Sequence, residues 1–169
     1  NRSLSAAIEK RIGKGFTTHL EELAKLAPLA KDPGFQQELW QIKQEHKAAL
    51  ARMISHAVGV RLNTDALFDV QVKRIHEYKR QLMCALHVIV LYRRLRFQNR
   101  EILPSVVVIG GKAAPGYARA KKHIKLINDI AAVVNNDPTV AGRLACVFVP
   151  NYSVSRAECI IPGANLSEQ

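Results

Sequence analysis

The stretch FDVQVKRIHEYKRQ, residues 68–81, is where the chain changes from helix-like to strand-like patterning. Its first five residues alternate between apolar and polar side chains, and this period of two predicts a half-buried strand. The residues after them are mostly charged and end where helical spacing begins. The stretch therefore predicts a strand, a loop and a helix start in direct succession.

Two further apolar runs follow the same plan. Residues 106–109 end in a Gly-Gly pair and residues 146–149 end in Pro-Asn, so both runs stop at turn-forming residues. Short, continuous apolar runs are typical of buried parallel strands. Spacings of three and four residues predict the helices between and after them, at 82–93, 117–134 and 155–163.

Helix-capping signals supply the remaining boundaries. Asp32, which precedes a proline, predicts the start of a long helix that ends near Gly59. Thr18, with a glutamate three residues later, predicts a capping box for a shorter helix over residues 20–26. Ser155, again with a glutamate three residues later, predicts a capping box for the last helix.

The alternation of strands and helices is the signature of a parallel sheet. We therefore predict an α/β fold: an incomplete Rossmann-like parallel sheet with flanking helices at 65–169, preceded by a helical segment at 1–64. Parallel sheets bind ligands at the carboxyl ends of their strands. Three loops are consequently candidate sites, at 73–79, 110–117 and 151–155.

Charge is concentrated in one part of the chain. The formal net charge is +11, and residues 73–125 contain 13 basic and two acidic residues, which accounts for the whole excess. A hydrophobic fraction of 48% is enough for a folded core, so a disordered basic tail is excluded. No apolar run resembles a signal-peptide core or the roughly 20 residues of a membrane span, so we expect no membrane partner. Three cysteines without metal-ligand spacing predict a reduced, cytoplasmic protein.

Residues 73–80, here called the basic loop, place four cations, a histidine and a tyrosine between a strand and a helix. A helix N-terminus presents free N–H groups and a partial positive charge, so it favours anions. Arginine grips phosphate through two hydrogen bonds, and lysine adds a compact charge. The basic loop therefore predicts a phosphate site, with a solvated basic helix end as the alternative.

The other two loops carry weaker signals. Residues 110–117 are rich in glycine but lack both the P-loop ending and the GxGxxG pattern, so a nucleoside triphosphate is not indicated. Their glycines allow the backbone to approach a ligand or a neighbouring loop closely, and a purely structural turn is an equal alternative. Tyr152 in the third loop is a candidate for stacking on a flat ligand. The sequence contains no Gly-x-Ser-x-Gly element and no spacing typical of a metal site.

A different function class stays open because basic residues also follow the predicted helices. They are Arg93, Arg94, Arg96, Arg100, Arg119, Lys121, Lys122 and Lys125. Such charge is the electrostatic footprint of a nucleic-acid-binding module. Aromatic residues are only 6% of the chain and no nucleic-acid motif is present, so a solvated helix surface is favoured and we expect no nucleic-acid partner.

The stretch 68–81 resembles the hallmark segment of the α-glucan phosphorylases, which act on glycogen, starch and maltodextrin. The resemblance continues in order through GGKAAPGY at 110–117, NNDP at 135–138 and LSEQ at 166–169, and more weakly over the first third. It implies part of the C-terminal lobe of a glycosyltransferase-B fold, with pyridoxal 5′-phosphate as cofactor. The implied reaction is reversible phosphorolysis of α-1,4-glucan ends by inorganic phosphate to glucose 1-phosphate, with retention at the anomeric carbon, in a homodimeric parent from an allosteric enzyme family.

The resemblance also implies catalytic roles within the basic loop. Arg74 matches the arginine that grips the substrate phosphate, and Lys79 matches a lysine near both phosphates. Tyr78 matches a contact to a sugar hydroxyl, and His76 supports the loop. The phosphate of the cofactor is implied to act beside the substrate phosphate as a proton relay.

Cofactor binding is implied for Lys73, Lys79 and Tyr152. Lys73 matches the lysine that contacts the cofactor phosphate, and Tyr152 matches the tyrosine beside the cofactor ring. Ser153 stands where many members carry arginine, so we expect no cofactor contact from it. The Schiff-base lysine of the family ends a glycine-rich stretch that is expected just after Gln169. We therefore expect a fragment that is inactive alone, with an anion-binding module or a functionless core as alternatives.

Overall fold

The computed structural model of the protein describes residues 1–168. The chain forms two compact units, Asn1–His46 and Lys47–Gln169. Helix α2, Pro33–Val58, runs through the boundary between them. Each unit is therefore described by itself.

The first unit is entirely helical. It contains α1 (Arg2–Ile12), the 3₁₀ helices η1 (Gly15–Thr17) and η2 (Leu20–Lys31), and the first part of α2. Asn1 caps α1 by accepting a hydrogen bond from the N–H of Leu4 at 3.0 Å. Arg11 pairs with Glu38 at 2.6 Å, and its guanidinium lies 4.2 Å from the centre of the Phe35 ring.

The structure confirms one predicted cap in this region and corrects another. Asp32 caps α2, because its Oδ1 accepts a hydrogen bond from the N–H of Phe35 at 2.6 Å, and Gly59 follows the helix with a positive φ of 74°. The capping box at Thr18 was wrong. The Thr18 hydroxyl donates to the Gly15 carbonyl at 3.2 Å, and η2 has no side-chain cap.

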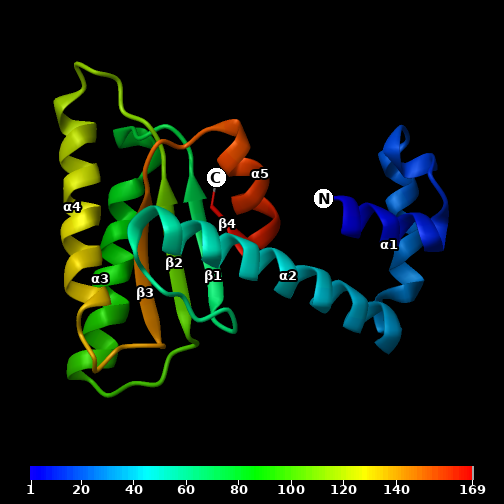
Figure 1. The fold of residues 1–169 in the computed structure, drawn as a ribbon, viewed down its shortest axis with the longest axis horizontal. Helices are drawn as coiled ribbons and strands as arrows, with labels where there is room; N and C mark the ends of the chain where they lie inside the picture. Colours follow the sequence, from blue (N-terminus) through cyan, green and yellow to red (C-terminus); the bar gives the residue numbers. More distant parts are fainter. Residues whose placement is uncertain (169) are drawn as a thin grey trace. The chain divides into compact units, whose positions relative to one another are not determined.

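The second unit is a parallel α/β sheet, as predicted (Figure 1). Its strands are β1 (Leu67–Val72), β2 (Ser105–Gly110), β3 (Leu144–Val149) and β4 (Leu166–Ser167), in the order β3-β2-β1-β4. Its helices are α3 (Gln81–Phe97), α4 (Ala118–Asn135) and α5 (Val154–Gly163), with the short 3₁₀ helix η3 (Glu77–Lys79) before α3.

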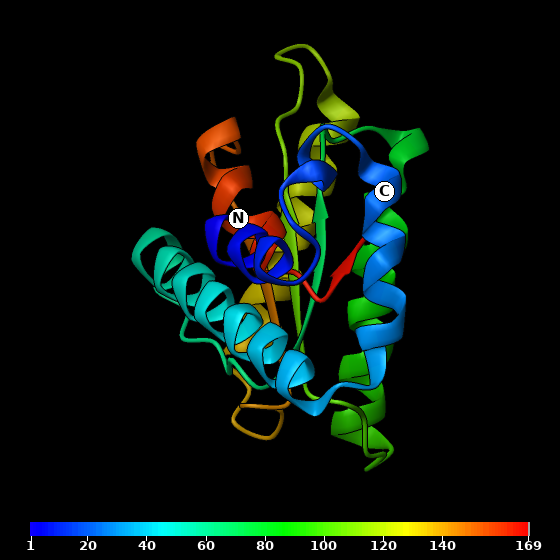
Figure 2. The same cartoon turned by 90° about the vertical axis from the view of Figure 1, so that its right-hand side faces the viewer.

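Helices cover both faces of this sheet. Figure 2 shows α3 and α5 on opposite sides of the strands. One apolar cluster joins α3 and α4 to β2 and β3, through residues such as Val88, Ile127 and Val107. A second cluster packs Leu50 and Ile54 of α2, together with α5, against the other face.

Strand β1 departs from the prediction of a half-buried strand. Asp69 and Gln71, expected on an exposed face, are only 6% and 4% exposed. Because α3 covers this face, the polar side of β1 is enclosed while Phe68 and Val70 fill the apolar cluster on the other side. Both faces of the strand are therefore buried.

The last helix begins differently from the prediction. Ser153 rather than Ser155 is the N-cap of α5, and its Oγ accepts a hydrogen bond from the N–H of Arg156 at 3.4 Å. The capping box at Ser155 was wrong because Asn151, with a φ of 53°, turns the chain so that the helix starts two residues earlier. Within residues 1–168, no helix is both long and apolar enough to cross a bilayer.

Candidate functional site

The carboxyl ends of three strands lie at the same edge of the sheet. Val72 pairs with Gly110, and Gly110 pairs with Val149, so β1, β2 and β3 end in register. The three candidate loops therefore start side by side. This placement follows from the parallel topology, which brings ligand-binding loops together.

The first two loops are in direct backbone contact. The N–H of Lys73 donates to the Gly110 carbonyl at 3.0 Å, and the N–H of Ile75 donates to the Lys112 carbonyl at 3.1 Å. Gly111 lies against the Lys73 carbonyl, where the structure leaves no room for a side chain. At Gly111 the structure shows close approach to a neighbouring loop, and contact of residues 110–117 with a ligand stays a prediction.

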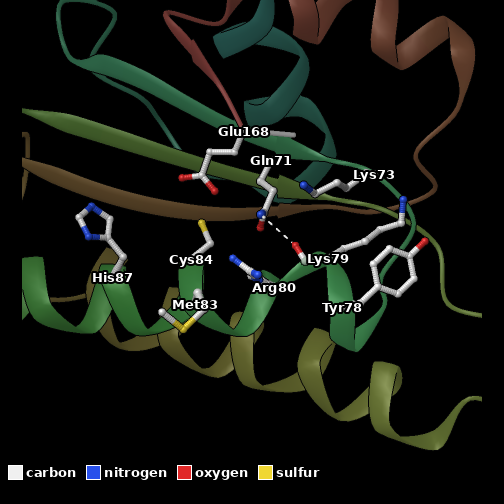
Figure 3. Close-up of a pocket in the computed structure, with 9 residues that line it drawn as sticks. All are labelled: Gln71, Lys73, Tyr78, Lys79, Arg80, Met83, Cys84, His87 and Glu168. Carbon is white, nitrogen blue, oxygen red and sulfur yellow. Dashed lines mark hydrogen bonds between the residues drawn. The ribbon is translucent and has the colours of Figure 1, made fainter.

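A cavity of about 550 Å³ lies beneath the basic loop (Figure 3). It is lined by Gln71, Lys73, Tyr78, Lys79, Arg80, Met83, Cys84, His87 and Glu168. Figure 3 shows Lys73, Lys79 and Tyr78 gathered toward one end and His87 at the other. The basic loop and the start of α3 thus supply one end of the cavity with positive charge.

The four cations of the basic loop have no acidic partner in the described part of the chain. Within residues 1–168, no carboxylate lies within 4.0 Å of Lys73, Arg74, Lys79 or Arg80. The nearest aromatic contact is from Lys79, whose Nζ lies 5.4 Å from the centre of the Tyr78 ring. Clustered cations repel one another, so an anion bound among them would relieve that repulsion.

The acidic residue of the basic loop, Glu77, is held by residues at the start of α4. The Tyr117 hydroxyl donates to Glu77 Oε2 at 2.6 Å, and Arg119 pairs with Oε1. The N–H of Glu77 in turn donates to the Tyr117 hydroxyl at 3.3 Å. The hydrogen bond from Tyr117, followed by that from Arg119, lowers the pKa of Glu77. The Glu77 carboxylate is therefore bound by the start of α4, and within residues 1–168 it forms no ion pair with the loop cations.

Comparison with known proteins identifies the family. All of residues 1–169 match the family model for carbohydrate phosphorylase. The chain belongs to the carbohydrate phosphorylase family. It is 52% identical over 169 residues to glycogen phosphorylase from Chlamydia trachomatis serovar D. This match covers the whole chain and 21% of that protein.

Other phosphorylases show similar identity. The muscle form of glycogen phosphorylase from Oryctolagus cuniculus and the glycogen phosphorylase of Synechocystis sp. are each 49% identical over 170 residues. These matches cover the whole chain and 20% of each relative. The chain thus spans about a fifth of the length of the curated phosphorylases it matches.

The structure brings together some of the predicted phosphorylase site residues. Lys73, Tyr78 and Lys79 line the cavity. His76 lies beside them, with its ring 4.3 Å from that of Tyr78 and 5.0 Å from that of Tyr117. Its Nδ1 also accepts a hydrogen bond from the N–H of Tyr78 at 3.4 Å, so His76 caps η3.

Two predicted site residues lie outside this group. Arg74 is exposed and does not line the cavity, although it belongs to the same loop. Tyr152 is partly buried against the apolar cluster on the α2 and α5 side of the sheet. Ser153 has a structural role as the cap of α5.

Sequence reasoning missed Gln81, the first residue of α3. Its side chain is fully buried, its Nε2 donates to the Arg74 carbonyl at 3.1 Å, and its Oε1 accepts from the N–H of His76 at 3.3 Å. One side-chain amide therefore ties two points of the basic loop to the helix. The available signal was spacing, since Gln81 shares one helical face with the buried Ala85 and Val88.

The inner part of the site contains a second group that was not anticipated. Burial and then the neighbouring Glu168 raise the pKa of Asp69 to about 6, against a weaker opposing effect of His87. Within the described part of the chain, Asp69 Oδ1 and Gln71 Oε1 have no hydrogen-bond partner. Of these two acceptors, Gln71 lines the cavity, and Asp69 lies two residues before it on β1.

Several basic residues of the helix surfaces are neutralised locally. Arg96 pairs with Asp137 at 3.2 Å, and Lys125 pairs with Asp129 at 2.7 Å. Arg119 is engaged by Glu77. Three of the eight basic residues named above for the helix surfaces are thus paired with carboxylates.

Proposed function

We propose that this chain forms the phosphate-binding part of a retaining glycosyltransferase, an α-1,4-glucan phosphorylase that converts glucan ends and inorganic phosphate reversibly to glucose 1-phosphate. The supporting observation is that Lys73, Lys79 and Arg80 line one cavity at the edge of a parallel sheet, and that within residues 1–168 none of the four loop cations has an acidic partner. A phosphate ion offers several acceptor oxygens, and Lys and Arg bind such groups through charge-assisted hydrogen bonds. Family membership indicates which phosphate chemistry this site serves.

Within this proposal, each residue of the basic loop has a distinct task. Arg74 and Lys79 hold the substrate phosphate, Tyr78 contacts a sugar hydroxyl, and His76 supports the loop through its ring contacts and its cap of η3. Lys79 lines the cavity on the same side as Lys73, so it is suited to screen two phosphates from each other. Like charges brought together need such screening.

The residues present also fit the phosphate of pyridoxal 5′-phosphate as cofactor. Lys73 and Lys79 line the cavity without a carboxylate partner in residues 1–168, and we propose that they hold this group. Tyr152 is proposed to lie beside the cofactor ring. When bound, the cofactor supplies a phosphate that relays a proton to and from the substrate phosphate.

The proposed setting of the whole protein is a cytoplasmic homodimer without a nucleic-acid partner. All three cysteines are free, which fits a reducing compartment. Because the chain spans a fifth of its relatives, we propose that it binds phosphate but does not convert glucan alone. Incubation with glycogen, phosphate and pyridoxal phosphate should release no glucose 1-phosphate.

Phosphate binding by the chain itself tests the site. Wild type and a Lys73→Ala/Lys79→Ala double variant should be titrated with inorganic phosphate by calorimetry. Each lost charge-assisted contact is worth about 1.5–3 kcal/mol, so the double variant should bind at least 100-fold more weakly. A Lys121→Ala/Lys122→Ala variant removes the same charge from the exposed surface of α4 and is the matched control. Equal weakening in both variants would show a diffuse charge effect and contradict the proposal.

Activity tests the role of Arg74. In a full-length phosphorylase that contains this segment, Arg74→Ala should reduce phosphorolysis at least tenfold, because one charge-assisted contact to phosphate is lost. Absorbance of pyridoxal phosphate should stay unchanged, since Lys73 and Lys79 remain. Unchanged activity at all phosphate concentrations would rule out this role.

A further inference from the structure

Two buried glutamines form hydrogen bonds to the backbone of the basic loop. Gln81 contacts both the Arg74 carbonyl and the N–H of His76. Gln71 donates from Nε2 to the Lys79 carbonyl at 3.5 Å. Gln81 forms the stronger link, because it makes two hydrogen bonds, one to Arg74 and one to His76, on the two sides of Ile75.

This support matters because the cations themselves are not held in place by acidic partners. Within residues 1–168, none of the four loop cations forms an ion pair, so the direction of each cationic side chain depends on the backbone that carries it. Mutual repulsion also favours spreading of the loop. A loop that is already ordered loses less conformational entropy on binding, so its affinity for an anion is higher.

Position 81 is where the loop turns into the helix. Arg80 has a φ of 61°, in the left-handed region that non-glycine residues adopt rarely. Gln81 follows immediately, is 0% exposed and does not line the cavity. Its amide thus acts on the loop and has no route to direct contact with an ion in the cavity.

We propose that Gln81 is a positioning residue of the anion site, whose side-chain amide fixes the backbone at Arg74 and His76 so that the cations lining the cavity, Lys73, Lys79 and Arg80, are held around one anion. This role rests on the proposed function. The donor and the acceptor of the amide are both required, because one bonds a carbonyl and the other an N–H. A side chain of equal size without these groups fills the space but leaves the loop unfixed.

The experiment compares Gln81→Met, Gln81→Glu and wild type by titration with sulfate, which stays a dianion between pH 5 and 8. Gln98→Met is the matched control, since Gln98 is an exposed glutamine at the other end of α3. At pH 8, both variants of Gln81 should bind sulfate about tenfold more weakly than wild type, and the control should bind within twofold of it. Circular dichroism and urea unfolding establish that each variant is folded.

The pH dependence separates positioning from packing. Burial raises the pKa of the carboxyl introduced by Gln81→Glu, so it takes up a proton as the pH falls. The protonated carboxyl reproduces the glutamine pattern: its O–H donates to the Arg74 carbonyl and its C=O accepts from the N–H of His76. The sulfate affinity of Gln81→Glu should therefore approach the wild-type value at pH 5, while the deficit of Gln81→Met stays constant. The charged and titratable residues near the loop, His76, Glu77, Tyr78, Lys79, Tyr117 and Arg119, are present in every protein, so each variant is compared with wild type at the same pH.

Each possible outcome either supports or overturns the positioning role of Gln81. Wild-type affinity in both variants at pH 8, or a pH-independent deficit in Gln81→Glu, would overturn the positioning role while leaving the anion site intact. Absence of sulfate binding by the wild-type chain would overturn the proposed function as well. If Gln81→Met does not fold, the ratio for Gln81→Glu between pH 8 and pH 5 gives the answer alone.

Discussion

Gly111 lies directly against the carbonyl oxygen of Lys73: a β-carbon at position 111 would stand 2.1 Å from that oxygen and 2.8 Å from Ile75 Cδ1. Because backbone cannot move aside as a flexible side chain can, Gly111→Ala should push the two loops apart. We expect a loss of about 1–3 kcal/mol in the free energy of unfolding, measured in urea, and weaker phosphate binding. Gly116→Ala is the control, since no heavy atom lies within 4 Å of its added carbon. Equal stability of the two variants would contradict this packing.

Asp69 should make stability depend on pH in an unusual direction. Its pKa in the folded chain, about 6, is above its ordinary value of 3.8, so the folded state binds the proton more tightly. The stabilisation from the neutral form is complete below about pH 4 and is lost as the pH rises through 6. Relative to wild type, the free energy of unfolding of Asp69→Asn should therefore rise by about 2–3 kcal/mol between pH 4 and pH 8.

Urea unfolding at several pH values measures this gain. Asp65→Asn serves as the control because it removes a carboxyl group at an exposed position. If the difference between Asp69→Asn and wild type does not change with pH, the pKa of Asp69 is not raised in the folded chain.

The contact between Glu77 and Tyr117 can be measured through the carboxyl group itself. The hydrogen bond from Tyr117 is the largest cause of the lowered pKa of Glu77. Tyr117→Phe removes that donor, so the pKa of Glu77 should move back toward its ordinary value. Carbon-13 NMR of the side-chain carboxyl follows this titration, and an unchanged midpoint would show that Arg119 alone holds the group.

The start of α5 offers a comparison between two serines. Ser153 caps the helix, so Ser153→Ala should lower the free energy of unfolding by about 1 kcal/mol. Ser155 is exposed within the first turn, and Ser155→Ala should change it by less than about 0.5 kcal/mol. A larger loss of stability in Ser155→Ala than in Ser153→Ala would contradict the cap at Ser153 and favour the capping box predicted at Ser155.

Sequence patterns were sufficient for the elements that repeat a simple period. The apolar runs before Gly110 and Pro150 predicted buried strands, and the observed β2 and β3 are parallel and in register. The loops at their carboxyl ends were predictable for the same reason, since topology alone places them at one edge. The basic loop therefore became a candidate site before any contact was known.

Contacts between distant residues could not be predicted in the same way. Asp69 and Gln71 alternate with apolar residues and so indicate an exposed face, yet α3 encloses them. Glu77 is bonded to Tyr117, 40 residues later in the chain, and no local pattern encodes that pairing. The capping box at Ser155 failed because the chain turns at Asn151 and Ser153 caps α5, so the spacing of serine and glutamate does not determine where the helix begins.

The shared register of Val72, Gly110 and Val149 restricts how this part of the family can change in length. One residue inserted within β1 would advance the basic loop by about 3.3 Å and reverse every following side chain, which would turn Lys73 toward the apolar cluster. Substitutions on the strands are therefore tolerable where insertions are not. Insertions and deletions should accumulate at the opposite edge, in residues 98–104 and 136–143, where the chain enters β2 and β3.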